Sequence, residues 1–160
     1  EAIEKWTDIK NENHKIQLHL IGRLQTNKVK FALKIFDYIH SLDSEKLANK
    51  ISDEQQKHKK KPKIFIQVNV GNEDQKSGID KRNLNDFYKF CKNLNLDIIG
   101  TMCIPPNNSN TEKYFSEMND LNKELNFKEL SMGMSGDYLE AIKYNATYIR
   151  IGSKIFGSRT

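Results

Sequence analysis

The stretch LSMGMSGDYLEAIKYNATYIRIGSKIFGSR, residues 130–159, contains the pattern on which the fold prediction depends. Its order of apolar and small residues predicts a strand, a small-residue turn, a helix, a second strand and a second small-residue turn. The small and hydroxyl residues of the two predicted turns are Ser131, Gly133, Ser135, Gly136, Gly152 and Ser153. Unpaired amides ahead of a helix favour an anion, so we expect this stretch to bind a phosphate group.

Apolar runs of strand length alternate with helical patterns along the rest of the chain. The predicted strands cover residues 16–22, 37–42, 63–70, 96–104, 128–134 and 146–152. The predicted helices cover residues 26–36, 47–61, 85–94, 109–125 and 136–145, and the chain starts inside a further helical pattern. Strands separated by helices of this length predict parallel strands covered by helices, so the predicted fold class is α/β.

The position of the phosphate pattern favours a barrel over a doubly wound dinucleotide-binding sheet. A dinucleotide fold needs a Gly-rich fingerprint after its first strand, and none stands near Gly22. A (β/α)8 TIM barrel commonly binds phosphate on the loops after its last two strands, which is where this pattern lies. The chain shows six strands and begins at Glu1 without Met. We therefore expect residues 1–160 to form one partial TIM-barrel domain that lacks its first two strand–helix units.

Composition and cysteine usage indicate a globular protein of the cytoplasm. Hydrophobic residues make up 37% of the 160 residues and charged residues 29%, which is enough for one domain with a core. No apolar run approaches membrane-spanning length, and we expect neither a leader nor a membrane partner. Cys91 and Cys103 are isolated, and His14, His40 and His58 have no ligand spacing, so no metal site is predicted.

The net charge of +5 raises the alternative of nucleic-acid binding. Only four of the 26 basic residues are arginine, and the densest cluster is the lysine run KHKKKPK, residues 57–63. Aromatic residues are absent from that run, and blocks of like charge are usually solvated, so an exposed loop is the expected structure. Sequence-blind attraction to phosphate backbones stays open as the weaker alternative.

Several blocks resemble one known family. They are HLIGRLQTNKVK, IFIQVNVGNEDQKSGID, GTMCIPPNNSNTEKYFSEM and LSMGMSGDYLEAI followed by YIRIGSKIFGSR. Together they resemble successive blocks of the pyridoxal phosphate homeostasis protein family, a group that binds pyridoxal 5'-phosphate (PLP) on an alanine-racemase-like barrel. The resemblance covers residues 1–159 and implies a carrier or buffer of the cofactor, with PLP as ligand and PLP-dependent apo-enzymes as partners. It assigns no catalytic turnover, so no catalytic residue is predicted.

The resemblance also implies a set of cofactor-binding positions. Met102 matches a residue that lines the pocket, although the family more often has Leu where this chain has Thr101. Ser131 and the turn 132–135 match the phosphate-side loop, Arg150 matches the basic residue beside the cofactor ring, and Gly152 with Ser153 match the second phosphate loop. The full predicted set is Met102, Ser131, Met132, Gly133, Met134, Ser135, Arg150, Ile151, Gly152 and Ser153.

The family's lysine that forms a Schiff base with PLP has no counterpart in this chain. In the family it lies on the first strand, which would precede Glu1. A covalent hold on PLP needs a suitably placed lysine amine. Lys76, in the loop NEDQKSGID, is the one lysine of the chain that we considered as a substitute. We expect this chain to bind the phosphate half of the cofactor without the covalent anchor.

Arg150 has the most informative predicted environment. Side chains alternate along the strand TYIRIGS, so Tyr148, Arg150 and Gly152 are predicted to face the barrel interior, with Ile149 and Ile151 under the outer helices. A guanidinium stays protonated, so beside a pyridine nitrogen it would donate a hydrogen bond and oppose ring protonation. That disfavours transamination and suits racemisation or carriage. The alternative is an ion pair with a carboxylate across the barrel floor.

Five further residues have local predictions. Ser135 is predicted to cap the following helix, and Asn145 to end that helix in the left-handed conformation. His19 is interpreted as a packing residue, Gly78 as a turn residue, and Asn69 as an inward polar residue whose role stays open.

Three functions from different classes follow. The first is the PLP carrier. The second is a small racemase, which would need a second acid/base that commonly comes from another domain of a partner subunit. The third is a nucleic-acid-binding module that uses the lysine run. The oligomeric state is left open.

Overall fold

The computed structural model describes residues 2–13, 15–73, 77–106 and 110–157. Within these ranges all the paired strands are parallel and follow the order β1-β2-β3-β5-β6-β7, with a short β4 paired to β3. The strands are β1 (His19–Leu20), β2 (Tyr38–Leu42), β3 (Lys63–Asn69), β4 (Ile79–Asp80), β5 (Asp97–Met102), β6 (Glu129–Met134) and β7 (Tyr148–Arg150). All six predicted strands are confirmed, and β4 was not predicted.

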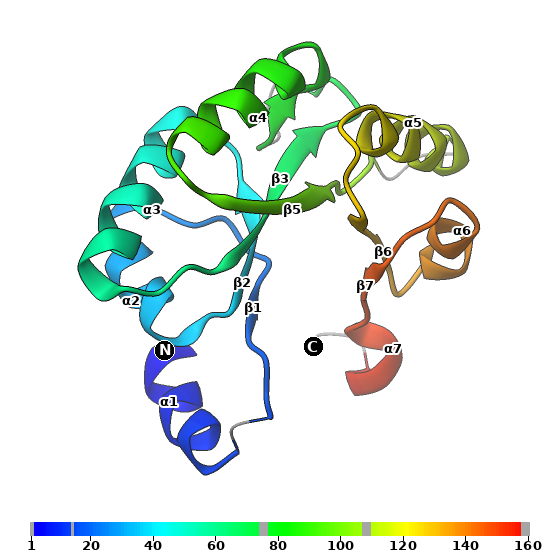
Figure 1. The fold of residues 1–160 in the computed structure, drawn as a ribbon. Helices are drawn as coiled ribbons and strands as arrows, with labels where there is room; N and C mark the ends of the chain where they lie inside the picture. The colour runs from blue at the N-terminus through cyan, green and yellow to red at the C-terminus, as the bar shows by residue number, and fades with distance from the viewer. Residues whose placement is uncertain (1, 14, 74–76, 107–109, 158–160) are drawn as a thin grey trace.

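Helices surround the outside of the sheet (Figure 1). They are α1 (Ala2–Glu12), α2 (Val29–Ile35), α3 (Glu45–His58), α4 (Leu84–Asn93), α5 (Thr111–Glu124), α6 (Tyr138–Lys143) and α7 (Ser153–Phe156), with the 3-10 turns η1 (Thr26–Lys28) and η2 (Lys81–Asn83). The predicted alternation of strands and helices is confirmed. The four-residue α7 lies where the sequence predicted only a turn.

The sheet curls into part of a barrel, so that its two ends face one another. Tyr148 on β7 lies 5.8 Å from His19 on β1 and 5.9 Å from Tyr38 on β2, measured between ring centroids. Strands β7 and β1 stand at opposite ends of the hydrogen-bonded order. Their inward side chains can meet only if the sheet is strongly curved. The curvature creates an interior, enclosed by strands, and an outer face covered by helices.

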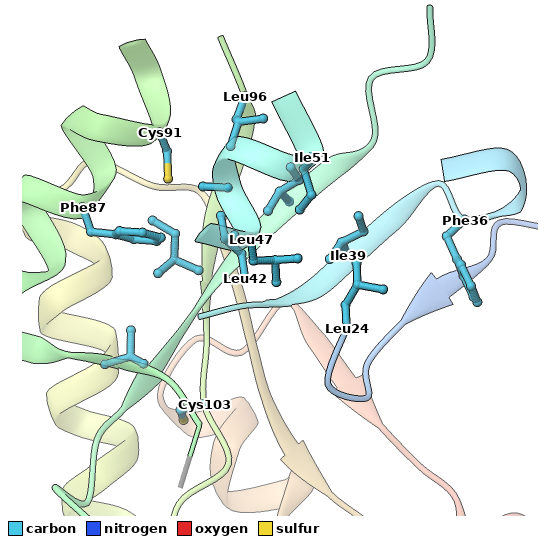
Figure 2. Packing of buried hydrophobic residues seen from close by; sticks show 14 of the residues in the cluster. Leu24, Phe36, Ile39, Leu42, Leu47, Ile51, Phe87, Cys91, Leu96 and Cys103 are labelled. Carbon is cyan, nitrogen blue, oxygen red and sulfur yellow. The ribbon is translucent and has the colours of Figure 1, made fainter. Parts of the chain in front are cut away.

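The outer face holds the main apolar core. Side chains from alternate strand positions pack against the amphipathic helices, and Figure 2 shows Ile39 and Leu42 of β2 beside Leu47 and Ile51 of α3. These four side chains are completely or almost completely buried. Burial of aliphatic side chains contributes about 1.5–3 kcal/mol each, so this layer supplies most of the favourable free energy of folding.

A close approach of β5 and β6 depends on Gly100. A Cβ built at this position would lie 1.8 Å from the Glu129 carbonyl oxygen, which no side chain can accommodate. Gly100 pairs with Glu129 in the β5–β6 register. The absence of a side chain here therefore permits the strand pairing that brings Met102 level with Ser131.

The lysine run 57–63 was predicted to be an exposed loop. Its exposure is confirmed for Lys57, Lys59, Lys61 and Lys63, but only part of the run is a loop. Lys57 and His58 complete α3, where Lys57 forms an ion pair with the buried Glu54 and His58 Nε2 lies 3.4 Å from the same carboxylate. Lys60 forms an ion pair with Asp37, and Lys61 donates a hydrogen bond to Asn95. The charges are thus divided among a helix end, a left-handed turn and a strand start because the segment connects α3 directly to β3.

Two further observations concern the outer surface. Ile149 points away from the interior but is 40% exposed, so the prediction that it packs under the outer helices is wrong. Helix α6 is short and leaves this side of β7 partly uncovered. No helix among the described residues is both long and apolar enough to span a bilayer.

Candidate functional site

Arg150 reaches into the interior from the end of β7. Its Nη1 donates to the Ser131 hydroxyl at 2.8 Å, and its Nη2 donates to the Cys103 carbonyl oxygen, also at 2.8 Å. The predicted inward orientation is confirmed, because both partners lie on or directly after the neighbouring strands β6 and β5. The two described acceptors are a hydroxyl and a carbonyl oxygen. The alternative prediction was an ion pair between Arg150 and a carboxylate, and neither acceptor is a carboxylate. The guanidinium therefore joins three strands at their carboxyl ends.

Two histidines continue the hydrogen bonding from Arg150 across the interior. The Ser131 hydroxyl lies 2.9 Å from His40 Nδ1, and His40 Nε2 lies 3.0 Å from His19 Nδ1. Ser131 and His40 are buried, and His40 stacks on the Phe65 ring at 4.3 Å between centroids. His19 in turn stacks on Tyr38 at 4.0 Å. Polar and aromatic side chains from five strands therefore occupy the same interior.

The two predicted phosphate turns lie side by side. The Ser135 hydroxyl oxygen accepts hydrogen bonds from the backbone N–H groups of Gly152 (3.1 Å) and Lys154 (3.3 Å). Two amides from the start of α7 thus converge on one oxygen atom. A phosphate oxygen is recognised by such convergent main-chain donors. We call the turn residues Ser135, Gly136, Gly152 and Ser153 the amide cradle.

There is room for a ligand at the amide cradle. A Cβ built at Gly136 or at Gly152 would meet no other atom within 4 Å. Both glycines and Ser153 are exposed, and Ser135 is partly exposed. Neither glycine has a positive φ that would by itself explain the residue type. The two positions are therefore open to an incoming anion.

The predicted capping role of Ser135 is wrong. Asp137 occupies the N-cap position of α6, and its carboxylate accepts a hydrogen bond from the backbone N–H of Met134 at 2.6 Å. Ser135 bonds instead to the amides at the start of α7. The tertiary contact between two turns, which no local sequence pattern specifies, decides which helix this hydroxyl serves. The left-handed conformation of Asn145 is confirmed by its φ of 65°.

Strand β6 contains four of the predicted site residues, Ser131, Met132, Gly133 and Met134. This agrees with the predicted strand 128–134, and of the predicted phosphate turn 132–135 only Ser135 lies beyond the strand. Ser131, Met132 and Gly133 are buried strand residues. Met132 packs in the outer core, on the face opposite Ser131, so its side chain does not reach the interior. Gly133 has a φ of +92°, and a Cβ there would lie 2.7 Å from Ala141 Cβ. Its role is to let α6 approach the strand.

The remaining predicted positions surround the cradle. Met102 is buried in the interior cluster with Tyr38 and Phe65, at the end of β5. Met134 is exposed at the end of β6, and Ile151 is half-buried between β7 and α7. Met102 thus lies at the end of β5 as expected, whereas Met134 and Ile151 mark the entrances to the two turns.

Burial controls the electrostatics of the interior. Desolvation lowers the pKa of His40 to about 3, and the neighbouring His19 and Arg150 charges act in the same direction. Desolvation also lowers the pKa of Arg150, although a guanidinium still keeps its proton. Burial raises the pKa of the Cys103 thiol to about 12, so this cysteine is not a nucleophile at neutral pH.

Sequence reasoning missed His40 and undervalued His19. His40 was considered only as a metal ligand. His19 was interpreted as a packing residue, with an orientation toward the barrel mouth as the less favoured alternative. One available signal was the alternation along β2, since Tyr38 and His40 share a strand face. Within the described residues, no group of three or more His, Cys, Asp or Glu side chains lies close enough to hold a metal ion.

No lysine is described beside Arg150 in the interior. Lys76 lies outside the described residues. Lys63 begins β3, at the opposite end of the strands, where its Nζ lies 3.4 Å from the Tyr38 hydroxyl. Asn69 ends β3, and its side-chain amide bonds to the backbone of Glu73 in the loop that follows. Gly78 lies directly before β4 and has a φ of +131°, as the predicted turn residue.

A large hollow of the described surface lies elsewhere. It has a volume of about 1050 Å³ and lies between the end of β1, α2 and the start of α3, lined by residues such as Leu24, Phe31 and Lys46. A smaller hollow of about 330 Å³ lies at the barrel mouth beside Gln67 and Asn69. Neither hollow includes Arg150 or the amide cradle. The volume of a hollow therefore does not identify the place where the hydrogen-bond donors of the candidate site converge.

Comparison with known sequences gives a consistent set of relatives. The family model described as alanine racemase, N-terminal domain, matches residues 3–160. A pyridoxal phosphate homeostasis protein of Aquifex aeolicus is 38% identical over 99% of this chain and 73% of its own length. The protein of the same name from Escherichia coli is 30% identical over 90% of this chain and 65% of its own length.

Comparison with solved structures agrees. PipY of Synechococcus elongatus, in a structure with PLP bound, superposes with a TM-score of 0.89 at 32% identity, covering 98% of this chain and 77% of PipY. An alanine racemase of Clostridium difficile superposes with a TM-score of 0.73 at 12% identity, covering 98% of this chain and 43% of the racemase. The latter likeness concerns the fold alone. The predicted alanine-racemase type of α/β fold is confirmed as a curled, partial barrel of parallel strands.

Proposed function

The chain belongs to the alanine racemase N-terminal domain family, among the pyridoxal phosphate homeostasis proteins, and we propose that it binds pyridoxal 5'-phosphate at the carboxyl ends of β5, β6 and β7. This is the function that the site supports best. The resemblance found in the sequence points to the same ligand, as does the related PipY, which was solved with PLP bound. The role that we propose is intracellular PLP homeostasis, as a carrier or buffer of the cofactor.

The observation that carries the proposal is the convergence of two backbone amides on a single oxygen. The N–H groups of Gly152 and Lys154 both point to the Ser135 hydroxyl oxygen. We assign this position to a phosphate oxygen, which would displace the Ser135 hydroxyl by rotation of its side chain and then accept from it. Open space at Gly136 and Gly152 supports the fit. The phosphate would be held by these amides together with the Ser135 and Ser153 hydroxyls.

We assign the ring of the cofactor to the space between the cradle and the interior. Ser131, Met102 and Arg150 would contact the ring, with Met102 as an apolar wall. Bound PLP supplies an electron-withdrawing ring whose strength depends on protonation of its nitrogen. Arg150 has only donors, so it would hold that nitrogen unprotonated. Such a site suits carriage, and it disfavours reactions that need a strong electron sink.

Absence of turnover is part of the proposal. The name of the curated relatives supports a homeostasis role, with PLP-dependent apo-enzymes as the receiving partners. We propose a cytoplasmic location, supported by the two free, buried thiols Cys91 and Cys103. We also propose that a complete barrel of this type has two further strand–helix units before β1. Within the described residues β1 and β7 are each paired on one side only, which supports that proposal.

The experiment compares PLP with pyridoxal, which lacks the phosphate, by isothermal titration calorimetry on the chain. PLP should bind at least about tenfold more tightly, since only PLP can use the cradle amides. Gly152→Ala should weaken PLP binding by about tenfold, because its methyl group would occupy part of the open space beside the cradle that we assign to the other phosphate oxygens. The same substitution should leave folding intact, as a Cβ there meets no other atom within 4 Å.

A matched control is Gly22→Ala, which also adds a methyl group in open space but after β1, on a residue that is not part of the amide cradle. It should leave PLP affinity unchanged. Equal affinity for PLP and pyridoxal, or equal weakening by both substitutions, would reject the phosphate site. Production of a D-amino acid from its L-isomer by the PLP-loaded chain would favour the racemase alternative.

A further inference from the structure

The proposed function uses Arg150 and Ser131 from the hydrogen-bonded series Arg150–Ser131–His40–His19, but neither of its two histidines. The series crosses the interior from β7 to β1, with successive distances of 2.8, 2.9 and 3.0 Å. Both ring nitrogens of His40 have a partner, and Ser131 and His40 are buried. We call these four side chains the interior series.

The chemistry of Arg150 gives the interior series a direction. A guanidinium can only donate, so the Ser131 oxygen accepts from Arg150. The Ser131 proton then needs an acceptor, and within the described ranges the one that the structure offers is His40 Nδ1. If His40 carried its proton on Nδ1, the buried hydroxyl proton would be left unpaired, which costs about 1–3 kcal/mol. His40 must therefore carry its proton on Nε2.

The same reasoning reaches the far end of the interior series. His40 Nε2–H donates to His19 Nδ1, so His19 carries its proton on Nε2. Both histidines are then neutral, in agreement with the desolvation that lowers the pKa of each of them. Stacking of His40 on Phe65 and of His19 on Tyr38 fixes the two ring planes. The donor and acceptor roles of all four side chains thus follow from one group, the guanidinium of Arg150.

We propose that His40 is a positioning residue for Arg150: as the Nε2–H tautomer it accepts the Ser131 proton, and so holds the Ser131 lone pair toward Arg150 Nη1. With Nη1 held there and Nη2 held by the Cys103 carbonyl, the guanidinium plane cannot rotate. The remaining N–H groups of Arg150 then keep one direction. This direction fixes the geometry of a hydrogen bond from Arg150 to the ring nitrogen of the cofactor. This inference deepens the proposed function and rests on it only for its ligand.

The first test needs no ligand. In the chain labelled with ¹⁵N at histidine and arginine, we expect His40 and His19 to show a protonated Nε2 and an unprotonated Nδ1 at neutral pH. Arg150 should show separate Nη signals because its rotation is restricted. A His40 proton on Nδ1, or a charged His40, would overturn the proposal regardless of whether PLP binds.

The second test uses a conservative and a non-conservative variant. In His40→Asn the amide oxygen can replace Nδ1 as acceptor, whereas His40→Leu offers none. We expect His40→Asn to keep the separate Arg150 signals and PLP affinity within about threefold, and His40→Leu to lose both, with about tenfold weaker binding. Ser131→Ala should reproduce the effect of His40→Leu if the latter does not fold.

The two hypotheses fail in different ways. Equal effects of His40→Asn and His40→Leu would overturn the positioning role, since a purely structural residue would not distinguish the acceptor. Failure of the wild-type chain to bind PLP, together with the expected tautomers and the expected Arg150 signals, would reject the proposed function and leave the positioning role supported.

Discussion

The two faces of the curled sheet are stabilised in different ways. The outer face is an apolar layer in which side chains such as Ile51, Phe115 and Leu33 are completely buried. The inner face combines three buried apolar side chains with a directed series of polar contacts. Apolar contacts are non-directional and scale with area, whereas each buried hydrogen bond needs one particular partner. The outer face therefore accounts for stability, and the inner face for chemical specificity.

The largest expected effect concerns the outer face. Phe115→Ala removes a completely buried ring from α5 and should lower the free energy of unfolding by about 3–5 kcal/mol through lost burial and a residual cavity. Denaturant unfolding followed by circular dichroism measures the change. Phe156→Ala is the control, because that ring is 84% exposed and its loss should be almost neutral. Similar losses in both variants would contradict the two-face distinction.

The next effect concerns the inner face and its dependence on pH. The pKa of His40 is lowered from 6.5 to about 3 in the folded chain, so the unfolded chain binds the proton more readily. The stabilisation from neutral His40 is complete above pH 6.5 and is lost as the pH falls towards 3. We expect it to amount to about 2–4 kcal/mol.

His40→Asn should remove this dependence. Carboxylates such as Glu54 also have lowered pKa values in the fold and lose stabilisation in acid, but Glu54 does so only as the pH falls below its ordinary value of 4.5. The interval between pH 6.5 and 5 therefore reports mainly on histidine. An identical slope of unfolding free energy against pH in both proteins over this interval would show that His40 is already charged or exposed.

The smallest expected effect on stability concerns a buried pair of polar side chains on the otherwise apolar outer face. Asn122 on α5 accepts hydrogen bonds from the backbone N–H of Thr101 at 3.2 Å and from its hydroxyl at 2.8 Å. Asn122→Ala leaves these buried donors unpaired and should cost about 1–3 kcal/mol. Thr101→Val removes only the hydroxyl and should cost about 1 kcal/mol.

The double variant of Asn122 and Thr101 sharpens this last comparison. If the hydroxyl bond matters, the combined loss in chemical denaturation should be smaller than the summed single losses, because Asn122→Ala already breaks that bond. Strict additivity would mean that this part of the outer face behaves as an apolar layer.

Much of the fold was predictable because its causes are local. The six strands and the helices between them follow from apolar periodicity, and Asn145 takes the left-handed conformation expected at a helix end. The inward orientation of Arg150 follows from alternation along one strand. The short β4 was missed, because two residues give no periodic signal.

The candidate site was predicted less completely than the fold. Grouping Ser135 with Gly152 was correct, but the hydroxyl of Ser135 serves α7 and not α6. Ser131 lies inside β6, as the predicted strand 128–134 requires, but the hydrogen bonds of its hydroxyl to Arg150 and His40 were not predicted. Such errors share one cause, since hydrogen bonds between strands distant in sequence leave no trace in local patterns.

By itself, the sequence determined the order of strands and helices, the parallel α/β class and the family resemblance, because periodicity, turn chemistry and motif blocks are properties of neighbouring residues. Only the tertiary structure decided that β7 faces β1, that two turns share the Ser135 oxygen, and that His40 lies between Ser131 and His19. The physical reason is the curvature of the sheet. It places side chains up to 131 positions apart in the sequence, from His19 to Arg150, in one hydrogen-bonded series. In that series the donor and the acceptor of each hydrogen bond are fixed by the guanidinium, which can only donate.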